Sequence, residues 1–565
     1  MRFRYVISFE RGIARHQIRE RASTAGLEIK GETSSMLVLV DPQTPVITGN
    51  ERVLIGQIFD ENGQRLFDLD SIFVDEDWAP RAGFWGNFLA VGASRLSPFV
   101  YRDPSGTIPA FHVSSENGDF FVSDAELACS LGLFDQPEFD AGFPVHWLQF
   151  PFLRSERTGL RDVREVLPGC VRRPMSGRWQ SEPGWKPWDH VRPGQKSCSF
   201  NQLGEQLRET TLRSIAAQVS GISPLLQLSG GLDSSIIAAS LAHAGIGFTP
   251  INFASRSSDG DERRYARSVA EHFGLPLIEI LEDGLDSTIR TPSERKFRPG
   301  SNPVLVPLDD AIEHHRREVG AALLIDGGGG DNLFCYLTGA APVLDALLAA
   351  SLGQAFQTCR DIADRAECTL WQVAASAIER ALPAGWWRWK EDRRYLRRDI
   401  LLPGADSHPW LEAPALSLPG KLEHVASLVH IQHFLDRRAG INSALLHPLL
   451  AEPLLDLCLA IPSFEWMRGG IDRAVARRAF RDLLPLDVVE RRSKGSLQGL
   501  FHRFFTALRD DLRDLLLSGR LVGSRIADAN AIELAFAKDD WRNDEIQMRL
   551  SEMASLELWL QSWAE

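Results

Sequence analysis

The sequence predicts a protein of mixed class, α/β combined with α+β. A β-rich first domain is expected over residues 1–190 and an α/β second domain over residues 200–565. Three observations predict this. Short strand-like runs between turn residues fill the first part, as in antiparallel sandwiches. Strand-like and helical stretches then alternate between residues 225 and 325, which indicates a doubly wound parallel sheet. From Ala340 onward the pattern is helical, so a large helical extension follows the sheet.

Composition and charge narrow the class of protein. A chain of 565 residues is too long for one hydrophobic core. The 62 Lys and Arg residues against 75 Asp and Glu residues leave a net charge of −13, which argues against a nucleic-acid partner. Seven scattered cysteines form no CxxC pair, the N-terminus has no apolar signal segment, and no run of 18 apolar residues occurs. These features predict a cytoplasmic protein.

The strands expected in the first domain are separated by Gly, Pro, Asp and Asn. They cover residues 4–10, 35–40, 46–48, 52–59 and 87–93. Further hairpins are expected around the turn at residues 104–106. A stretch that mixes Pro, Gly, Ser and Trp with charges, residues 180–201, is expected to be the linker to the second domain.

The stretch LLQLSGGLDSSIIAA, residues 225–239, is the most informative part of the chain. A buried strand is expected at residues 225–228, followed by the turn SGG and a helix. Free N–H groups at the start of such a helix and the helix dipole favour an anion such as phosphate, and the glycines let the backbone approach it. Asp233 adds a carboxylate able to hold Mg²⁺ beside phosphates. No GK[ST] follows, so this is not the common P-loop.

A second stretch, LLIDGGGGDNLF at residues 323–334, repeats this arrangement. An apolar strand runs into four glycines and then into the carboxylate of Asp331. In a packed element each glycine costs about 0.5–1 kcal/mol relative to alanine, so a run of four fits a backbone that lies against a nucleotide. A flexible surface loop is the alternative. Asp233 and Asp331 together could hold Mg²⁺ against the phosphates.

These motifs resemble those of a known superfamily. The string SGG-L-DSS resembles the pyrophosphate loop of ATP-pyrophosphatase-type ligases, and DGGGGDNLF resembles the glycine-rich segment of asparagine synthetases. The strings GFWGNFLAV, YRDPSGTIPAFH and TGLRDVREVLPG resemble the N-terminal glutaminase domain of asparagine synthetases. The resemblance implies an Ntn-type, glutaminase-like β-sandwich followed by an adenine nucleotide α-hydrolase-like ATP-pyrophosphatase domain. It also implies that ATP is split into AMP and pyrophosphate.

The same resemblance assigns roles to individual residues, with ATP and Mg²⁺ as cofactors. The implied catalytic residues are Asp233, Asp331 and Lys494, the two aspartates being the Mg²⁺ ligands. Lys494 would neutralise charge on the acyl-adenylate and the phosphates, and a solvated lysine in a basic run is the alternative. The implied nucleotide site consists of Leu228, Ser229, Gly230, Gly231, Asp233, Ser234, Ser235, Phe253, Asp326 and Gly327.

Two departures from the superfamily pattern concern the nucleophile. Glutaminase domains use an N-terminal cysteine, but position 2 here is Arg2, so no thiolate is available and the first domain is expected to be a structural remnant. Asparagine synthetases carry a glutamate three residues before the position of Asp331. This chain has Gly328 there, which is expected to leave the site wider and less negative. With both departures, the chain most resembles lasso peptide cyclases.

The resemblance to lasso peptide cyclases implies a reaction and partners. Such an enzyme adenylates an Asp or Glu side-chain carboxylate of a precursor core peptide. The α-amine of the same peptide then closes a macrolactam ring, and AMP and pyrophosphate are released. The implied partners are the precursor peptide, a leader-recognition protein, a leader peptidase and an ABC exporter, through which the cytoplasmic enzyme would lie at the inner membrane.

Other functions remain open at this stage. One is an ammonia-dependent asparagine synthetase-like or β-lactam-forming ligase acting on a small molecule. Another is a non-catalytic nucleotide-binding scaffold, against which the two intact carboxylates argue. A nucleic-acid-modifying ligase with the same loop is disfavoured by the net charge.

Several aromatic residues and histidines have a structural explanation. Trp386, Trp387 and Trp389 are expected to pack within the helical part, and gripping an extended peptide is the alternative. His430 and His433 are expected to be core or surface histidines rather than a metal pair, because no acidic ligand is near them in sequence.

Overall fold

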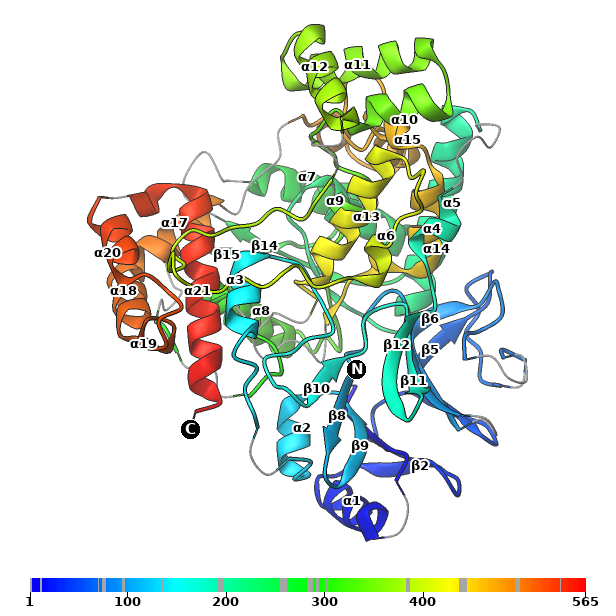
Figure 1. Ribbon diagram of the computed structural model, residues 1–565. Helices are drawn as coiled ribbons and strands as arrows, with labels where there is room; N and C mark the ends of the chain where they lie inside the picture. Colours follow the sequence, from blue (N-terminus) through cyan, green and yellow to red (C-terminus); the bar gives the residue numbers. More distant parts are fainter. Residues whose placement is uncertain are drawn as a thin grey trace.

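The computed structural model describes residues 3–564 apart from residues 11–12, 70, 74–77, 94–96, 135–136, 192–197, 255–261, 282–287, 291–293, 301, 383–386, 436–444, 493–497 and 539. Its first part is a sandwich of two six-stranded sheets, both antiparallel throughout (Figure 1). In sheet order, the first contains β10 (Val163–Glu165), β8 (Phe111–Ser115), β9 (Gly118–Val122), β1 (Tyr5–Ser8), β3 (Leu37–Val40) and β2 (Glu28–Glu32). The second contains β12 (Arg178–Pro183), β11 (Cys170–Met175), β7 (Pro98–Arg102), β6 (Trp85–Ala93), β5 (Arg52–Phe59) and β4 (Val46–Thr48).

The two sheets share one apolar core. Ile7 and Val38 of the first sheet pack in the same cluster as Ile55 and Leu89 of the second. The short helices of this part are α1 (Ile13–Thr24), α2 (Ala125–Ser130), α3 (Phe143–Gln149) and α4 (Pro187–His190). The predicted strands at residues 46–48 and 52–59 agree with β4 and β5, so short strand-like runs bounded by turn residues were sufficient signals here.

The prediction that residues 180–201 form a linker is wrong for most of this stretch. β12 continues to Pro183, α4 follows, and α5 already begins at Phe200. Trp185 is buried and donates a hydrogen bond from Nε1 to Asp456 (3.0 Å). Trp188 donates from Nε1 to the backbone carbonyl of Trp410 (2.9 Å). These contacts with the distant helical part order the segment, and its own composition does not reveal them.

The second part is built on a five-stranded, fully parallel sheet. The strand order is β15 (Ile278–Leu281), β14 (Thr249–Ala254), β13 (Leu225–Gln227), β16 (Leu324–Ile325) and β17 (Leu445–Leu446). The order reverses at β13, which has β14 on one side and β16 on the other. In doubly wound sheets such a reversal creates the crevice, at the carboxyl ends of the strands, where ligands bind. The predicted parallel sheet is therefore confirmed, and its two glycine-rich loops follow the two strands at this point.

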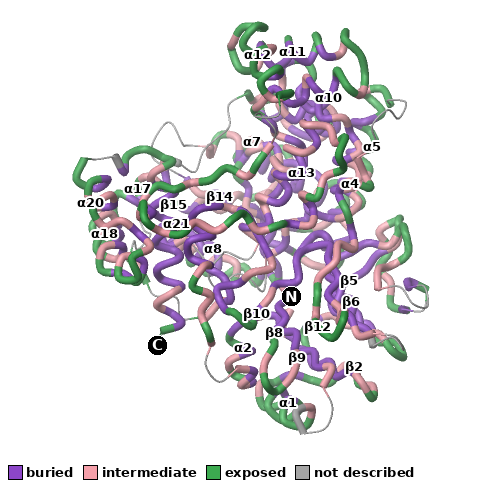
Figure 2. The backbone as a smooth tube through the Cα atoms, viewed as in Figure 1, coloured by how far each residue is buried: buried purple, intermediate pink, exposed green. Residues whose placement is uncertain are grey.

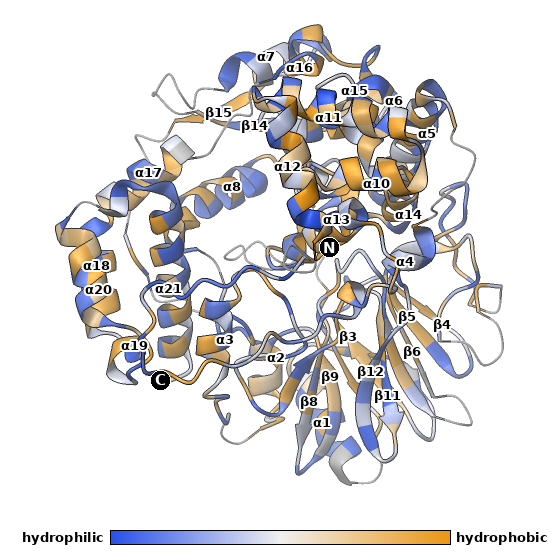
Figure 3. Ribbon diagram, turned by 45° about the horizontal axis from the view of Figure 1, so that its top comes forward, coloured by the Kyte–Doolittle hydropathy of each residue, from blue (hydrophilic) through white to orange (hydrophobic). Residues whose placement is uncertain are grey.

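The helices of the second part surround the sheet and extend far beyond it (Figures 1 and 3). They are α5 (Phe200–Val219), α6 (Leu232–His243), α7 (Arg263–His272), α8 (Val306–Glu318), α9 (Gly330–Leu333), α10 (Ala341–Ala349), α11 (Leu352–Ala366), α12 (Leu370–Ala381), α13 (Pro419–Gln432), α14 (Glu452–Ala460), α15 (Ala474–Phe480), α16 (Leu486–Val489), α17 (Gln498–Ala507), α18 (Arg509–Ser518), α19 (Arg520–Gly523), α20 (Ala529–Ala537) and α21 (Asp544–Ser562). Short 3₁₀ turns lie at Pro303–Leu305, Pro409–Leu411, Pro448–Leu450, Ser463–Met467 and Asp540–Arg542. The predicted helical extension is confirmed, with β17 as an exception.

Buried residues run through the centre of the molecule, and many exposed residues lie on its outer helices (Figure 2). Helices α10–α12 project at the top of Figure 1, and α17–α21 form a separate group beside the sheet. Among the described residues, the structure contains no helix with the length and apolar character needed to cross a bilayer.

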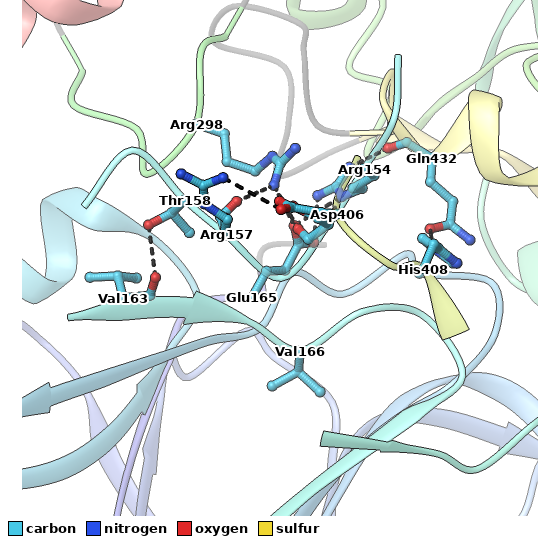
Figure 4. A network of polar contacts seen from close by, with 12 residues as sticks. Arg154, Arg157, Thr158, Val163, Glu165, Val166, Arg298, Asp406, His408 and Gln432 are labelled. Atoms are coloured by element: carbon cyan, nitrogen blue, oxygen red, sulfur yellow. Dashed lines mark hydrogen bonds and ion pairs between the residues drawn. The ribbon is translucent and has the colours of Figure 1, made fainter. Parts of the chain in front are cut away.

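A buried ion network centred on Glu165 of β10 joins the two parts. Its carboxylate accepts hydrogen bonds from Arg102 of β7 (2.8 Å) and Arg154 (2.9 Å), and Arg298 of the second part lies 3.5 Å from Oε2. Figure 4 shows Arg154 and Arg298 converging on Glu165. All four side chains are buried, and Arg154 also donates to the carbonyl of Gln432 in α13. The network connects both sheets of the sandwich with the helical part.

Candidate active site

The first loop of the site joins β13 to α6. Gly230 has φ +73°, and a Cβ at this position would lie 2.6 Å from the Cβ of Tyr265 in α7, so both conformation and space require glycine. Gly231 is the N-cap residue of α6, and no side chain caps the helix there. The N–H groups of the first turn are therefore suited to an anionic ligand.

The predicted serines form hydrogen bonds within this loop and hold its conformation. The Ser229 hydroxyl accepts the Gly231 N–H (3.2 Å), and the Ser234 hydroxyl accepts the Ser229 N–H (3.3 Å). Ser235 is fully buried and donates to the Gly231 carbonyl (2.7 Å). Leu228 is also buried, and its N–H continues the sheet toward β14. Ser235 and Leu228 thus hold the loop in place from the buried side.

The second glycine loop lies directly against the first. A Cβ at Gly327 would lie 3.0 Å from the Ser234 nitrogen, and a Cβ at Gly330 would overlap the carboxyl group of Asp233. Gly329 has φ +86°, and a Cβ there would lie 2.5 Å from Leu450. The glycine run therefore permits close contact between two loops, as well as approach to a ligand.

The structure brings Asp233 and Asp331 together around one cation of the protein itself. Arg473 Nη1 lies 3.2 Å from Asp233 Oδ1 and 2.7 Å from Asp331 Oδ1. Arg473 has φ +50° at the start of α15, and its Nε donates to Asp472 (2.9 Å). Burial lowers the pKa of the Arg473 guanidinium, but the carboxylates of Asp233, Asp331 and Asp472 outweigh this and raise the pKa above its ordinary value. Arg473 is therefore a permanent positive charge between the two aspartates.

This donor set fits a magnesium ion bound together with phosphate. Two carboxylates that approach the same cationic nitrogen offer oxygen ligands on one side of a divalent ion. Among the described residues, no group of three or more His, Cys, Asp and Glu side chains gathers at a possible metal site. Water and phosphate oxygens would supply the remaining ligands, as is usual for Mg²⁺, and the ion would neutralise phosphate charge.

Two further predicted site residues, Phe253 and Lys494, do not belong to the two loops. Phe253 of β14 packs into the core beside the sheet. Lys494 lies outside the described residues. Arg491, three residues before it, donates to Glu262 (2.7 Å), and its guanidinium lies 4.0 Å from the centre of the Tyr265 ring. Because Tyr265 also lies against Gly230, Arg491 lies near the first loop.

The space beside Gly328 is filled, so the expectation of a wider site is wrong at this position, while a less negative site stays a prediction. A Cβ at Gly328 would lie 2.6 Å from His447 Nδ1 and 2.8 Å from Asp326 Oδ1. An imidazole and a carboxylate therefore occupy the space beside this glycine. The sequence places His447 and Asp326 121 residues apart, and only the pairing of β16 with β17 brings them together.

Residues 206–561 match the family model described as asparagine synthase. The chain belongs to the asparagine synthase family. The predicted superfamily is thereby confirmed, and membership makes the chain an ATP-dependent ligase that forms carbon–nitrogen bonds.

No curated protein matches the chain. Two solved structures resemble this asparagine synthase family member at 11% identity and a TM-score of 0.20. The allosteric regulatory enzyme of purine biosynthesis is matched over 57% of this chain and 83% of its own. The glutamine phosphoribosylpyrophosphate amidotransferase from B. subtilis, complexed with ADP and GMP, is matched over 73% of this chain and 100% of its own.

The aromatic residues and histidines set apart in the sequence are mostly structural. Trp389 packs against the main core and donates from Nε1 to the Pro151 carbonyl (2.9 Å), and the Trp387 ring meets it edge-on at 5.7 Å. Trp386 lies outside the described residues. His430 and His433 are packed among aromatic rings, and burial lowers the pKa of His430 to about 4, so it is neutral in the core.

Gly330→Ala tests the contact between the two loops. Because the added Cβ overlaps the Asp233 carboxyl group, we expect the Kd for ATP in the presence of Mg²⁺ to rise at least about tenfold. Isothermal titration calorimetry measures this. Gly247→Ala is the matched control, because nothing lies within 4 Å of a Cβ at that position. Unchanged affinity in Gly330→Ala would place the nucleotide elsewhere.

Proposed function

We propose that this asparagine synthase family member is a lasso peptide cyclase. It adenylates an Asp or Glu side-chain carboxylate of a precursor core peptide with ATP and Mg²⁺, and pyrophosphate leaves. The α-amine of the same peptide then displaces AMP and closes a macrolactam ring. The first domain is proposed to be a glutaminase-like fold without its nucleophile.

The cysteines of the first domain carry this proposal. Burial raises the pKa of the Cys170 thiol in β11 well above its ordinary range, and burial also raises the pKa of Cys129. A nucleophilic cysteine needs a lowered pKa, so neither described thiol of the first domain suits glutamine hydrolysis. A ligase whose first domain offers no described thiol suited to glutamine hydrolysis is expected to take its amine from the substrate.

Ring closure within one peptide has a physical advantage. Adenylation joins a carboxylate oxygen to AMP, so that AMP becomes a good leaving group on the acyl carbon. A folded peptide then holds the amine and the acyl carbon in one molecule, which can contribute up to about 7–11 kcal/mol to lowering the barrier. The proposed partners follow from this substrate: a leader-recognition protein, a leader peptidase and an ABC exporter.

The proposal is tested with a synthetic core peptide taken from a short reading frame beside the gene. We expect peptide-dependent pyrophosphate release and, by mass spectrometry, a product lighter than the peptide by one water. An N-acetylated peptide should still support ATP–pyrophosphate exchange but give no ring, because its amine is blocked. A peptide with its acceptor Asp or Glu changed to Asn or Gln should support neither.

The competing function is a ligase that acts on a small molecule with ammonia. It would release pyrophosphate with aspartate and ammonia and form asparagine without any peptide. That result would refute the cyclase proposal while leaving the chain an ATP-dependent ligase.

A further inference from the structure

Two polar side chains emerge side by side at the carboxyl end of the parallel sheet. β16 and β17 are neighbouring parallel strands, with Leu324 opposite Leu445 and Ile325 opposite Leu446. The next residues along the two strands are Asp326 and His447. Neighbouring parallel strands end at the same edge, so the register itself places this carboxylate and this imidazole together.

The two side chains form an oriented pair. His447 Nδ1 and Asp326 Oδ1 are 2.7 Å apart, and the same oxygen accepts the Gly328 N–H at 2.8 Å. An ionised carboxylate only accepts hydrogen bonds, so Nδ1 carries the proton and donates it to Asp326. In the neutral imidazole, Nε2 then holds the free lone pair.

Nothing in the described part of the chain uses this lone pair. His447 Nε2 is buried, and no described residue forms a hydrogen bond with it. Leaving a buried polar atom unpaired costs free energy, so such an atom calls for an explanation. The backbone around it is held firmly, because Gln218 Nε2 donates to the carbonyl of the next residue, Pro448 (3.1 Å).

The pair shares the second glycine loop with the two aspartates. At one end of the loop, a Cβ at Gly328 would lie 2.6 Å from His447 Nδ1. At the other, a Cβ at Gly330 would overlap Asp233. The imidazole therefore lies next to the loop against which ATP would be activated, at the position where Gly328 supplies no side chain.

We propose that His447 is the general base of the amide-forming step and that Asp326 is its positioning residue. This inference rests on the proposed adenylation and amide formation. The attacking amine nitrogen bonds to the acyl carbon of the adenylate, and the carbon–oxygen bond to AMP breaks, so AMP leaves with the electron pair. One proton of the nitrogen passes to His447 Nε2 and from there to solvent.

The test separates the two half-reactions in the full-length protein. His447→Asn keeps a donor for Asp326 and removes the base. We expect the rate of amide formation with the synthetic core peptide to fall about 10²–10⁴-fold, the usual contribution of a general base, while ATP–pyrophosphate exchange stays near the wild-type rate. Hydroxylamine, which is largely unprotonated at neutral pH, should still trap the acyl-adenylate as a hydroxamate. Asp326→Asn should lower amide formation more than it lowers exchange, because it no longer fixes the tautomer, so its readout is the ratio of the two rates.

Controls make the result specific to this pair. His315→Asn removes another histidine whose Nδ1 lies near a carboxylate, that of Glu318 at 3.0 Å in the same helix α8, and we expect no change in either half-reaction. An equal loss of exchange and amide formation in a normally folded His447→Asn protein would overturn the inference, and so would full amide formation. If His447→Asn does not fold, Asp326→Asn carries the same test. Should the wild-type protein use aspartate and ammonia instead of peptide, the cyclase proposal fails and the role of His447 is tested with ammonia as the amine.

Discussion

Asp233→Asn and Asp331→Asn are each expected to lower ATP–pyrophosphate exchange by at least about 100-fold. Both carboxylates approach the same nitrogen of Arg473, at 3.2 and 2.7 Å, so they concentrate negative charge where a cation binds. Asparagine has the same shape and removes one charge, which weakens the Mg²⁺ site and the pyrophosphate that it would hold. Arg473 keeps its bond to Asp472, so the fold is expected to persist. Exchange of labelled pyrophosphate into ATP measures the effect.

Asp364→Asn is the matched control for these two variants. Asp364 lies exposed on α11, and its carboxylate is 3.9 Å from the Arg360 guanidinium. We expect wild-type exchange from this variant. Undiminished exchange in both Asp233→Asn and Asp331→Asn would show that the pair is not the metal site, and the assignment of both loops would then be wrong.

Glu165→Gln is expected to lower the free energy of unfolding by about 3–5 kcal/mol. Arg102, Arg154 and Arg298 all approach the Glu165 carboxylate in a buried environment (Figure 4). Glutamine leaves these guanidinium groups without their counter-charge and offers one acceptor in place of two oxygens. Because the network joins the two parts of the molecule, we expect the packing of one part against the other to be lost in a single cooperative transition at lower denaturant concentration. Chemical denaturation followed by tryptophan fluorescence measures the change.

The same carboxylate predicts a direction of pH dependence. Burial raises the pKa of Glu165, but Arg154, Arg298 and Arg102 outweigh it and hold the pKa below its ordinary value. A lowered pKa in the folded state contributes stability above the pKa of the unfolded chain, and this is lost as the pH falls through the folded pKa. Wild-type stability should therefore fall more steeply below about pH 4 than that of Glu165→Gln.

Glu182→Gln is the control for this prediction. Its partner Arg173 lies 2.9 Å away on the same sandwich, and both side chains are about one third exposed. An exposed pair of this kind contributes about 0–1 kcal/mol, so we expect little change. A loss in Glu165→Gln no larger than that in Glu182→Gln would show that the buried network does not stabilise the junction.

Much of the fold could be predicted from local patterns. The runs at residues 52–59 and 225–228 are long or apolar enough to identify β5 and β13, and the glycines after the latter mark the turn into α6. The linker prediction failed at Trp185, which is buried in the main core and donates a hydrogen bond to Asp456 far along the chain. β17, with two residues, is too short for any periodicity, so the strand that precedes His447 could not be recognised.

The sequence by itself determined the two strand–glycine–helix loops, the aspartate in each, and the family to which they belong. These features are local, because backbone conformation at a glycine turn and the residue that follows it are set within a few positions. The tertiary structure alone decided that Arg473, 240 residues from Asp233, lies between the aspartates, and that His447 faces Asp326 beside Gly328. Both depend on strand order and helix packing, which join distant segments at one edge of the sheet.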